Sequence, residues 1–114
     1  MMITYPICHK EDIPENSAKG FSLETRFGEI TFFVIHKNAK HFAYVNSCPH
    51  TNINVEWMPD QFLDINNELI RCSLHGAKFQ IEDGYCIFGP CLGQRLMPLE
   101  VRIEGDDLQL VTDY

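Results

Sequence analysis

The chain carries Cys48-Pro49-His50 and, after a spacer of residues 51–71, Cys72-Ser73-Leu74-His75-Gly76. Each of these two arms offers one thiolate and one imidazole. Two cysteines alone would suggest a disulfide, and two histidines alone would suggest a surface feature or a zinc site. The mixed pair occurs twice, as C-x-H and as C-x-x-H, and this indicates a metal centre whose two halves prefer different donors.

The donor set suits a pair of iron ions. Thiolates are soft, charge-donating ligands that hold ferric iron, whereas imidazole is neutral and of intermediate softness. Two thiolates on one iron and two imidazoles on the other form the ligand set of a Rieske centre. With two bridging sulfides, the oxidised cluster is neutral instead of carrying the net charge of about −2 that four thiolates would give, so it accepts an electron more readily.

The residues around both arms extend the pattern. The first arm is preceded by Ala43-Tyr44-Val45-Asn46-Ser47. The second arm continues as Ala77-Lys78-Phe79 and is followed by Glu82-Asp83-Gly84 and Gly89-Pro90-Cys91. From about Phe32 to the C-terminus the chain resembles the Rieske [2Fe-2S] ferredoxin family, with its A-Y-x-N-x-C-P-H, C-x-x-H-G-x-x-F, acidic-Gly turn and Gly-Pro loop.

The resemblance implies one [2Fe-2S] cluster, with Cys48 and Cys72 on the inner iron and His50 and His75 on the outer, solvent-facing iron. It also implies that the Gly-Pro loop covers the cluster. The chain departs from the family pattern at Asn52, where Gly is usual, and at Ser73, where Pro is usual. Neither position is a ligand in the family, so both concern the loops.

Two other kinds of site use the same residue types. A structural zinc site of two cysteines and two histidines usually pairs like ligands in each arm, which the mixed arms do not. A catalytic Cys-His pair needs only one residue of each type, so it would leave the repeat unexplained.

The second arm predicts a low potential. High-potential relatives in quinol-oxidising complexes carry Ser directly after His-Gly and Tyr two residues later, whose hydroxyls donate hydrogen bonds to sulfur. They also carry a disulfide between the two ligand loops. Here the matching positions are Ala77 and Phe79 for the hydroxyls, and Ile53 with Ser73 or Leu74 for the disulfide. The chain therefore resembles the low-potential, bacterial oxygenase-type ferredoxins.

The length of 114 residues predicts a single domain. Segments rich in β-branched and aromatic residues alternate with turn residues, and no segment has a helical period. We predict an all-β, antiparallel Rieske fold, in which a cluster-binding part of about residues 46–92 is inserted in a base formed by residues 1–45 and 93–114. The expected strands are 3–7, closed near Pro6, and 20–25, 30–35, 41–46, 68–71, 78–81, 85–88, 99–104 and 108–111.

Charge and composition restrict the partners. The net charge of −7 disfavours nucleic acid and anionic membranes, and it suits either docking to basic redox partners or simple solubility. No signal peptide and no apolar run of about 18 residues are expected. We therefore predict a cytoplasmic, monomeric carrier, in whose reducing surroundings Cys8, Cys86 and Cys91 remain thiols.

Three functions are compatible with these features. The leading one is an electron carrier, itself not an enzyme, that takes electrons from a ferredoxin reductase and passes them to an oxygenase or a related terminal oxidoreductase. The second is a redox subunit bound permanently to a larger oxidoreductase, like the small subunits of nitrite reductase or arsenite oxidase. The third is a zinc-stabilised interaction module.

Overall fold

The computed structural model describes residues 2–47, 62–64, 66–71, 77–89 and 92–112. In these residues the chain forms nine strands and one 3-10 turn, η1 (Lys10–Asp12), so the predicted all-β, antiparallel fold is confirmed. The strands are β1 (Ile3–His9), β2 (Ser17–Thr25), β3 (Gly28–Lys37), β4 (Lys40–Val45), β5 (Leu69–Arg71), β6 (Lys78–Gln80), β7 (Cys86–Phe88), β8 (Pro98–Glu104) and β9 (Asp107–Thr112). Within the described ranges, no helix is long and apolar enough to cross a membrane.

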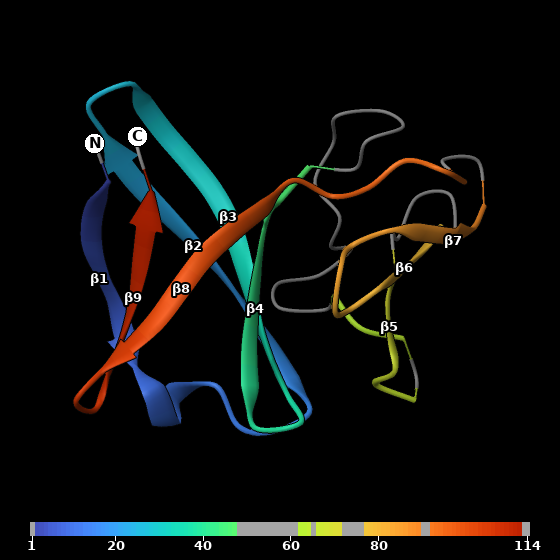
Figure 1. Cartoon of the computed structure of the whole chain (residues 1–114), viewed down its shortest axis with the longest axis horizontal. Coiled ribbons are helices and arrows are strands. Elements are labelled where there is room, and N and C mark those ends of the chain that lie inside the picture. The colour runs from blue at the N-terminus through green and yellow to red at the C-terminus, as the bar shows by residue number, and fades with distance from the viewer. Residues whose placement is uncertain (1, 48–61, 65, 72–76, 90–91, 113–114) are drawn as a thin grey trace.

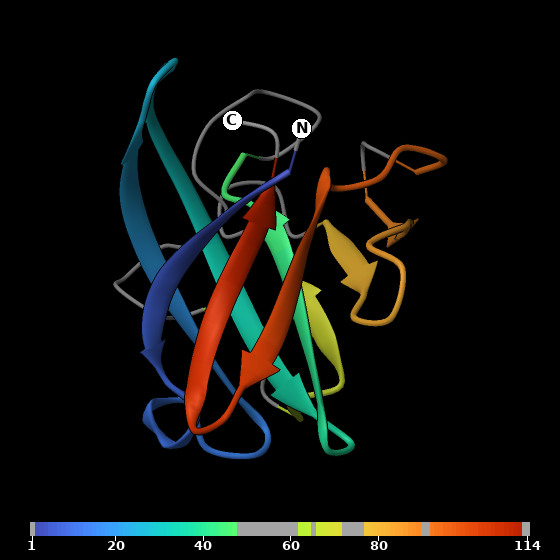
Figure 2. The same cartoon turned by 60° about the vertical axis from the view of Figure 1, so that its left-hand side comes forward.

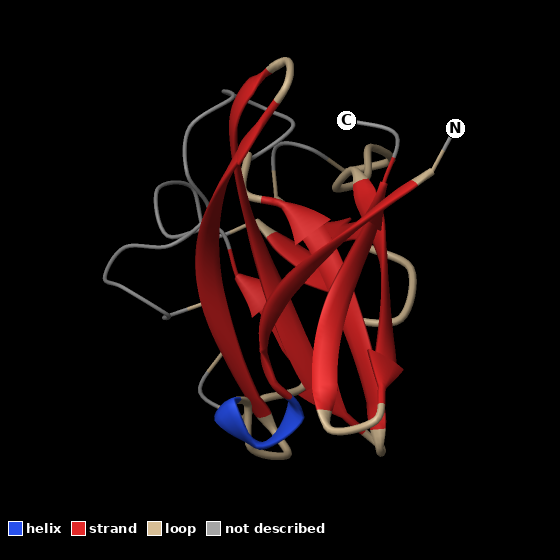
Figure 3. Cartoon of the chain, turned by 90° about the vertical axis from the view of Figure 1, so that its left-hand side faces the viewer, coloured by secondary structure: helices blue, strands red, loops and turns tan. Residues whose placement is uncertain are grey.

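Six strands form one antiparallel sheet in the order β1-β9-β8-β4-β3-β2. Strands from both ends of the chain meet in it, because β1 pairs with β9 and β8 pairs with β4 (Figure 1). Figure 2 shows β9 lying between β1 and β8. At one end of this sheet, η1 lies beside the β8–β9 turn (Figure 3), and the Lys10 N–H donates to the Asp106 carbonyl at 2.8 Å.

The other three strands form a small sheet in the order β5-β6-β7, to the right in Figure 1. Both of its edges are paired further. The Arg71 N–H donates to the Phe62 carbonyl at 2.9 Å on the β5 side. On the β7 side, the Cys86 N–H donates to the Gln94 carbonyl at 2.8 Å. Neighbouring segments therefore extend the small sheet at both edges.

Two apolar cores share strands β3 and β4. The core inside the large sheet includes Phe32 and Val34 of β3, with Leu108 of β9. The core between the two sheets includes Phe33 and Ile35 of β3, with residues of the small sheet. Successive side chains of a strand point to opposite faces. Burial of β3 on both faces therefore explains why residues 30–35 read as a continuous apolar run instead of an alternating one.

The first strand is longer than predicted. It continues past Pro6 to His9, and its register with β9 shifts between Pro6 and Cys8. Proline is tolerated in an edge strand or at a bulge, where its missing N–H leaves no gap in the ladder. The other predicted strands are found, with their ends moved by at most three residues.

Candidate metal centre

All four predicted cluster ligands, Cys48, His50, Cys72 and His75, lie outside the described residues. The described residues before the first arm and on both sides of the second arm show where each arm joins the fold.

The first arm leaves from the end of β4. Val45 N–H donates to the Met97 carbonyl, and Asn46 N–H donates to the Thr31 carbonyl, each at 2.9 Å. Asn46 is buried. The backbone is therefore held on both sides up to the second residue before Cys48.

The second arm is the loop of a hairpin. Arg71, the residue before the arm, is paired with Lys78 across strands β5 and β6. Residues 72–77 connect these two strands. Pairing of the flanking residues fixes both ends of the loop, so the donors at positions 72 and 75 are carried on one short connection between rigid strands.

Gly89, where the Gly-Pro loop begins, lies close to Ala77, the residue after the second arm. Gly89 has a φ of 103°, and a Cβ added there would lie 2.7 Å from the Cα of Ala77. Only glycine allows this approach and this backbone conformation together. Leu92 N–H donates to the Gly89 carbonyl at 3.2 Å. Gly89 thus packs directly on the residue that follows the second arm, as expected at the start of a loop that covers a cluster.

Tyr44 connects the first arm's strand to the small sheet. Its hydroxyl donates to the Ile81 carbonyl at 2.5 Å, and the same bond lies in the core between the sheets. Its ring faces Gly84, where an added Cβ would lie 2.8 Å from Tyr44 Cε1. Burial, and then the charge of Asp83, raise the pKa of Tyr44 to about 12. Tyr44 therefore stays a neutral donor at any physiological pH.

The two faces of the small sheet differ sharply. Ile70, Phe79 and Cys86 face the core and are buried. In the neighbouring row, Arg71 pairs with Lys78, and Lys78 with Phe88. Since side chains alternate along a strand, Arg71 and Lys78 point away from the core. The register between β6 and β7 shifts between Lys78 and Phe79, so Phe88 joins this row although it lies two residues after the buried Cys86. Phe88 is 63% exposed.

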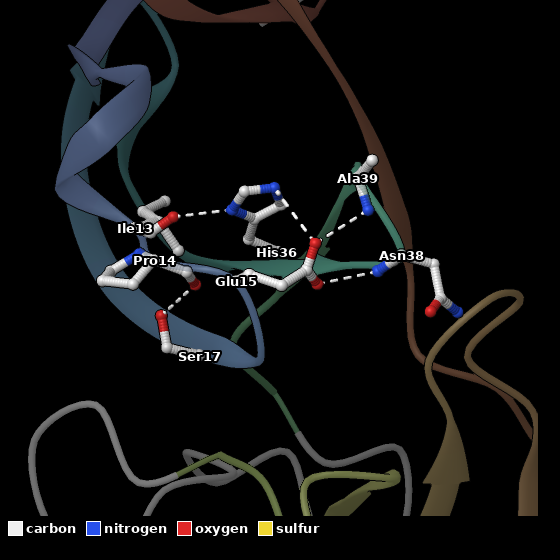
Figure 4. Close-up of polar contacts among 7 residues, drawn as sticks. All are labelled: Ile13, Pro14, Glu15, Ser17, His36, Asn38 and Ala39. Carbon is white, nitrogen blue, oxygen red and sulfur yellow. Dashed lines mark hydrogen bonds and ion pairs between the residues drawn. The ribbon is translucent and has the colours of Figure 1, made fainter.

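A second polar cluster lies around the β3–β4 turn (Figure 4). His36 and His41 are paired across the hairpin with their rings stacked, 4.2 Å between centroids. His36 Nδ1 lies 2.8 Å from the Ile13 carbonyl, and its Nε2 lies 3.7 Å from Glu15. The Glu15 carboxylate accepts the N–H groups of Ala39 and of the neighbouring residue 38, at 2.8 Å each.

These contacts shift two pKa values. The Ala39 N–H in particular lowers the pKa of Glu15. Burial, and then the charge of His36, lower the pKa of His41, whose Nε2 has no hydrogen-bond partner among the described residues. The two histidines also border a cavity of about 370 Å³, with Lys10 and Ile103 on its other sides.

The other three cysteines were predicted to remain thiols, and of these Cys91 lies outside the described residues. Cys8 is half-buried in β1, and burial, followed by the charge of Asp12, raises its pKa. Cys86 is buried, and its thiol donates to the Phe88 carbonyl at 3.2 Å. Among the described residues, no three His, Cys, Asp or Glu side chains gather as a metal site would require.

Sequence reasoning missed the stacked histidine pair and the role of Tyr44. The pair was within reach, because a two-residue turn at residues 38 and 39 places His36 opposite His41. Both turn residues have positive φ, 54° and 62°. Nothing local signals the Tyr44 bond, since its acceptor lies 37 residues away.

The donor chemistry and the surrounding structure fit an iron–sulfur cluster. Two thiolates and two imidazoles are available on two arms. The first arm follows the paired strand β4, and the second lies between the paired strands β5 and β6. Beside the second arm, Gly89 and Ala77 leave room for backbone only, which suits a cover that excludes water from the cluster.

Comparisons with known proteins agree with this. A model of the Rieske [2Fe-2S] domain family matches residues 3–112. The fold is similar to a ferredoxin of carbazole 1,9a-dioxygenase from Nocardioides aromaticivorans IC177 (TM-score 0.75, 16% identity, 97% of this chain and 98% of that chain). It is also similar to a chain of the complex of reduced oxygenase and oxidized ferredoxin in carbazole 1,9a-dioxygenase (0.75, 20%, 95% and 92%). A third similar structure is the terminal oxygenase of carbazole 1,9a-dioxygenase from Novosphingobium sp. KA1 (0.74, 19%, 97% of this chain but 30% of that chain).

Proposed function

Because this chain belongs to the Rieske [2Fe-2S] domain family, we propose that it is a single-electron carrier that takes electrons from a reductase and delivers them to an oxygenase or a similar terminal oxidoreductase. The observation that carries the proposal is the extent of the family match, residues 3–112 of 114. The cluster-binding domain thus accounts for nearly the whole chain. Its length resembles that of the ferredoxin of carbazole 1,9a-dioxygenase, and it covers only 30% of the terminal oxygenase.

The chain itself is proposed to lack catalytic activity. A Rieske oxygenase adds a mononuclear iron held by two histidines and one carboxylate, and this needs a second set of ligands. Rieske domains hold a [2Fe-2S] cluster through two cysteines and two histidines, and the bound cluster supplies one-electron transfer. The protein's own part is to hold that cluster, to exclude water from it and to present it to partners.

We assign the four ligand positions to the two arms. Cys48 and Cys72 hold the inner iron, and His50 and His75 hold the outer iron near the surface. The mixed arms of the sequence support this assignment. So does the pairing of Arg71 with Lys78, which flank the second arm on its two sides.

We also propose that residues of about 46–92 form the cluster-binding part, inserted in a base of residues 1–45 and 93–114. The separate small sheet of β5, β6 and β7 supports this division. We also propose a cytoplasmic location, because that compartment keeps cysteine thiols reduced.

The test is ligand replacement followed by visible spectroscopy. Alanine at any one proposed ligand should abolish the brown colour and lower the melting temperature, because such a site is not preformed without its metal. The positions to change are Cys48, His50, Cys72 and His75. Matched controls are alanine variants of the other cysteines, Cys8, Cys86 and Cys91, which should keep the wild-type spectrum. Loss of the spectrum in a control would show a misassigned ligand, and a colourless wild type with bound zinc would refute the proposal.

Gel filtration of the native protein from cell extract distinguishes a mobile carrier from a bound subunit. A carrier elutes near its own mass of 13.2 kDa. Elution only together with a larger oxidoreductase would show that the protein is a permanently bound subunit and not a mobile carrier.

A further inference from the structure

The charge of the molecule is unevenly distributed around the second arm. The chain has a net charge of −7, and residues 46–92 contain six acids but only two bases. The two bases are Arg71 and Lys78, which stand immediately before and shortly after the arm. Both cations of this acidic segment therefore border one short loop.

The two cations are cross-strand neighbours on the outer face of the small sheet. Like charges directly opposite each other destabilise a strand pair, so this arrangement costs stability in the isolated protein. Within the described part of the chain, neither cation forms an ion pair. Burial would raise the pKa of Asp64, but the backbone N–H groups of Glu68 and Leu69, and after them the charge of Lys78, lower it. The Asp64 carboxylate already accepts the N–H groups of Glu68, at 2.9 Å, and Leu69, at 3.3 Å.

An exposed apolar border adjoins the cations. Phe88 is the next residue in the row after Lys78 and is 63% exposed, and Leu92, bonded to Gly89 through its N–H, is 68% exposed. Gly89 in turn packs on Ala77, the residue after the second arm. Cationic groups beside exposed apolar side chains can bind a partner surface that offers both carboxylates and apolar side chains.

We propose that Arg71, Lys78 and Phe88 form a docking surface for a carboxylate-bearing face of the protein that accepts the electron. This inference rests on the proposed function, since it places electron exit at the second arm. It reverses the simplest reading of the net charge, which predicts a basic partner. Global charge governs the far field, but charges within about one Debye length, about 10 Å at 0.1 M salt, govern the docked encounter.

The test uses two small outer-sphere oxidants of opposite charge on the reduced, cluster-loaded protein. Stopped-flow rates are measured with hexacyanoferrate(III), an anion, and hexaammineruthenium(III), a cation, at low and high salt. The variant is Arg71→Gln with Lys78→Gln. The matched control, Lys40→Gln with Arg102→Gln, removes the same charge from exposed positions on β4 and β8 of the large sheet.

We expect hexacyanoferrate(III) to oxidise the wild type more slowly as salt rises, despite the net charge of −7. The Arg71/Lys78 variant should react with this anion roughly three- to ten-fold more slowly at low salt, because two nearby positive charges are lost. The control should change far less. Short poly-L-glutamate, a source of carboxylates, should slow the wild-type reaction and leave the Arg71/Lys78 variant unaffected.

Two results would overturn the inference. One is a wild-type rate with the anion that rises with salt, together with equal effects of the two double variants. The other is an equal rise with both oxidants in the Arg71/Lys78 variant, because loss of two positive charges lowers the cluster's potential and raises the driving force for either oxidant; this would show that the cations act on the potential instead of on docking. Arg71→Lys with Lys78→Arg keeps both charges and should restore the wild-type rates if the first variant is disturbed. Failure of the proposed function has a different readout, a protein without the cluster's visible spectrum.

Discussion

Ala77 and Phe79 occupy the positions at which high-potential relatives place hydroxyl donors. Both side chains are fully buried. Ala77 lies against Gly89, and Phe79 faces the core beside Ile70 and Cys86. Neither side chain can donate a hydrogen bond to sulfur. Both positions therefore lack a donor that would stabilise the reduced, more negative cluster.

The double variant Ala77→Ser with Phe79→Tyr should therefore raise the reduction potential. A hydrogen bond worth about 1–3 kcal/mol corresponds to roughly 40–130 mV for one electron. The wild type is expected near the lower end of the Rieske range, about −150 mV. Protein-film voltammetry measures both values, and Phe88→Tyr, which adds a hydroxyl at the surface, is the control. A wild-type potential above zero would contradict the low-potential assignment, and an unchanged double variant would remove the hydrogen-bond explanation.

At the scale of elements, Tyr44 holds β4 to the turn between β6 and β7. Replacing it with Phe leaves the buried Ile81 carbonyl without its donor, and this should lower the free energy of unfolding by about 1–3 kcal/mol. Urea unfolding at pH 7 measures the change. Tyr85→Phe is the matched control, because Tyr85 is 43% exposed and its loss of a hydroxyl should cost little. Equal stabilities of the two variants would show that the Tyr44 bond contributes nothing.

The β3–β4 hairpin should respond to acid through its stacked histidines. A carbonyl only accepts, so His36 Nδ1 carries a hydrogen toward Ile13, and a proton on Nε2 would face Glu15. His41 has no such acceptor, and burial, then the charge of His36, hold its pKa below the usual 6.5. Its contribution to stability is therefore complete above about pH 6.5 and is lost as pH falls through the lowered value.

We expect the melting temperature of the wild type to fall more steeply between about pH 7 and 5.5 than that of His41→Phe, which keeps a ring in the stack but cannot be protonated. Circular dichroism melts across this range measure the difference. The two proteins should behave alike in slope above pH 7. Parallel curves over the whole range would mean that protonation of His41 does not oppose folding.

At the scale of the molecule, two cores with different dependence on the metal lie on either side of β3. The core inside the large sheet is built from the base strands alone. The core between the sheets depends on the small sheet, whose strands are three residues long and carry the ends of the second arm. Without metal the ligand loops lose their cross-link.

Removal of the cluster should therefore loosen one sheet before the other. Amides of β5, β6 and β7 should exchange with solvent much faster in the metal-free protein, whereas those of β3, β4 and β9 should stay protected. Hydrogen exchange with mass spectrometry measures both sets in one experiment, with the loaded protein as reference. Uniform loss of protection would show that the base does not stay folded without the cluster.

The sequence by itself determined the donor types and their spacing, the all-β class and nearly every strand. Each of these depends on local chemistry: thiolate and imidazole selectivity, β-branched and aromatic runs, and turn residues such as those at positions 82–84. Even the two-sided burial of β3 was readable from its continuous apolar run.

Only the tertiary structure decided which distant groups meet. It set Arg71 beside Lys78, brought Gly89 onto Ala77 and bonded Tyr44 to Ile81. These contacts depend on which strands pair and in which register, and register follows from the burial of whole faces instead of from any one segment. Local sequence sets the conformation of each segment, but the packing of the complete chain determines which other segments that segment contacts.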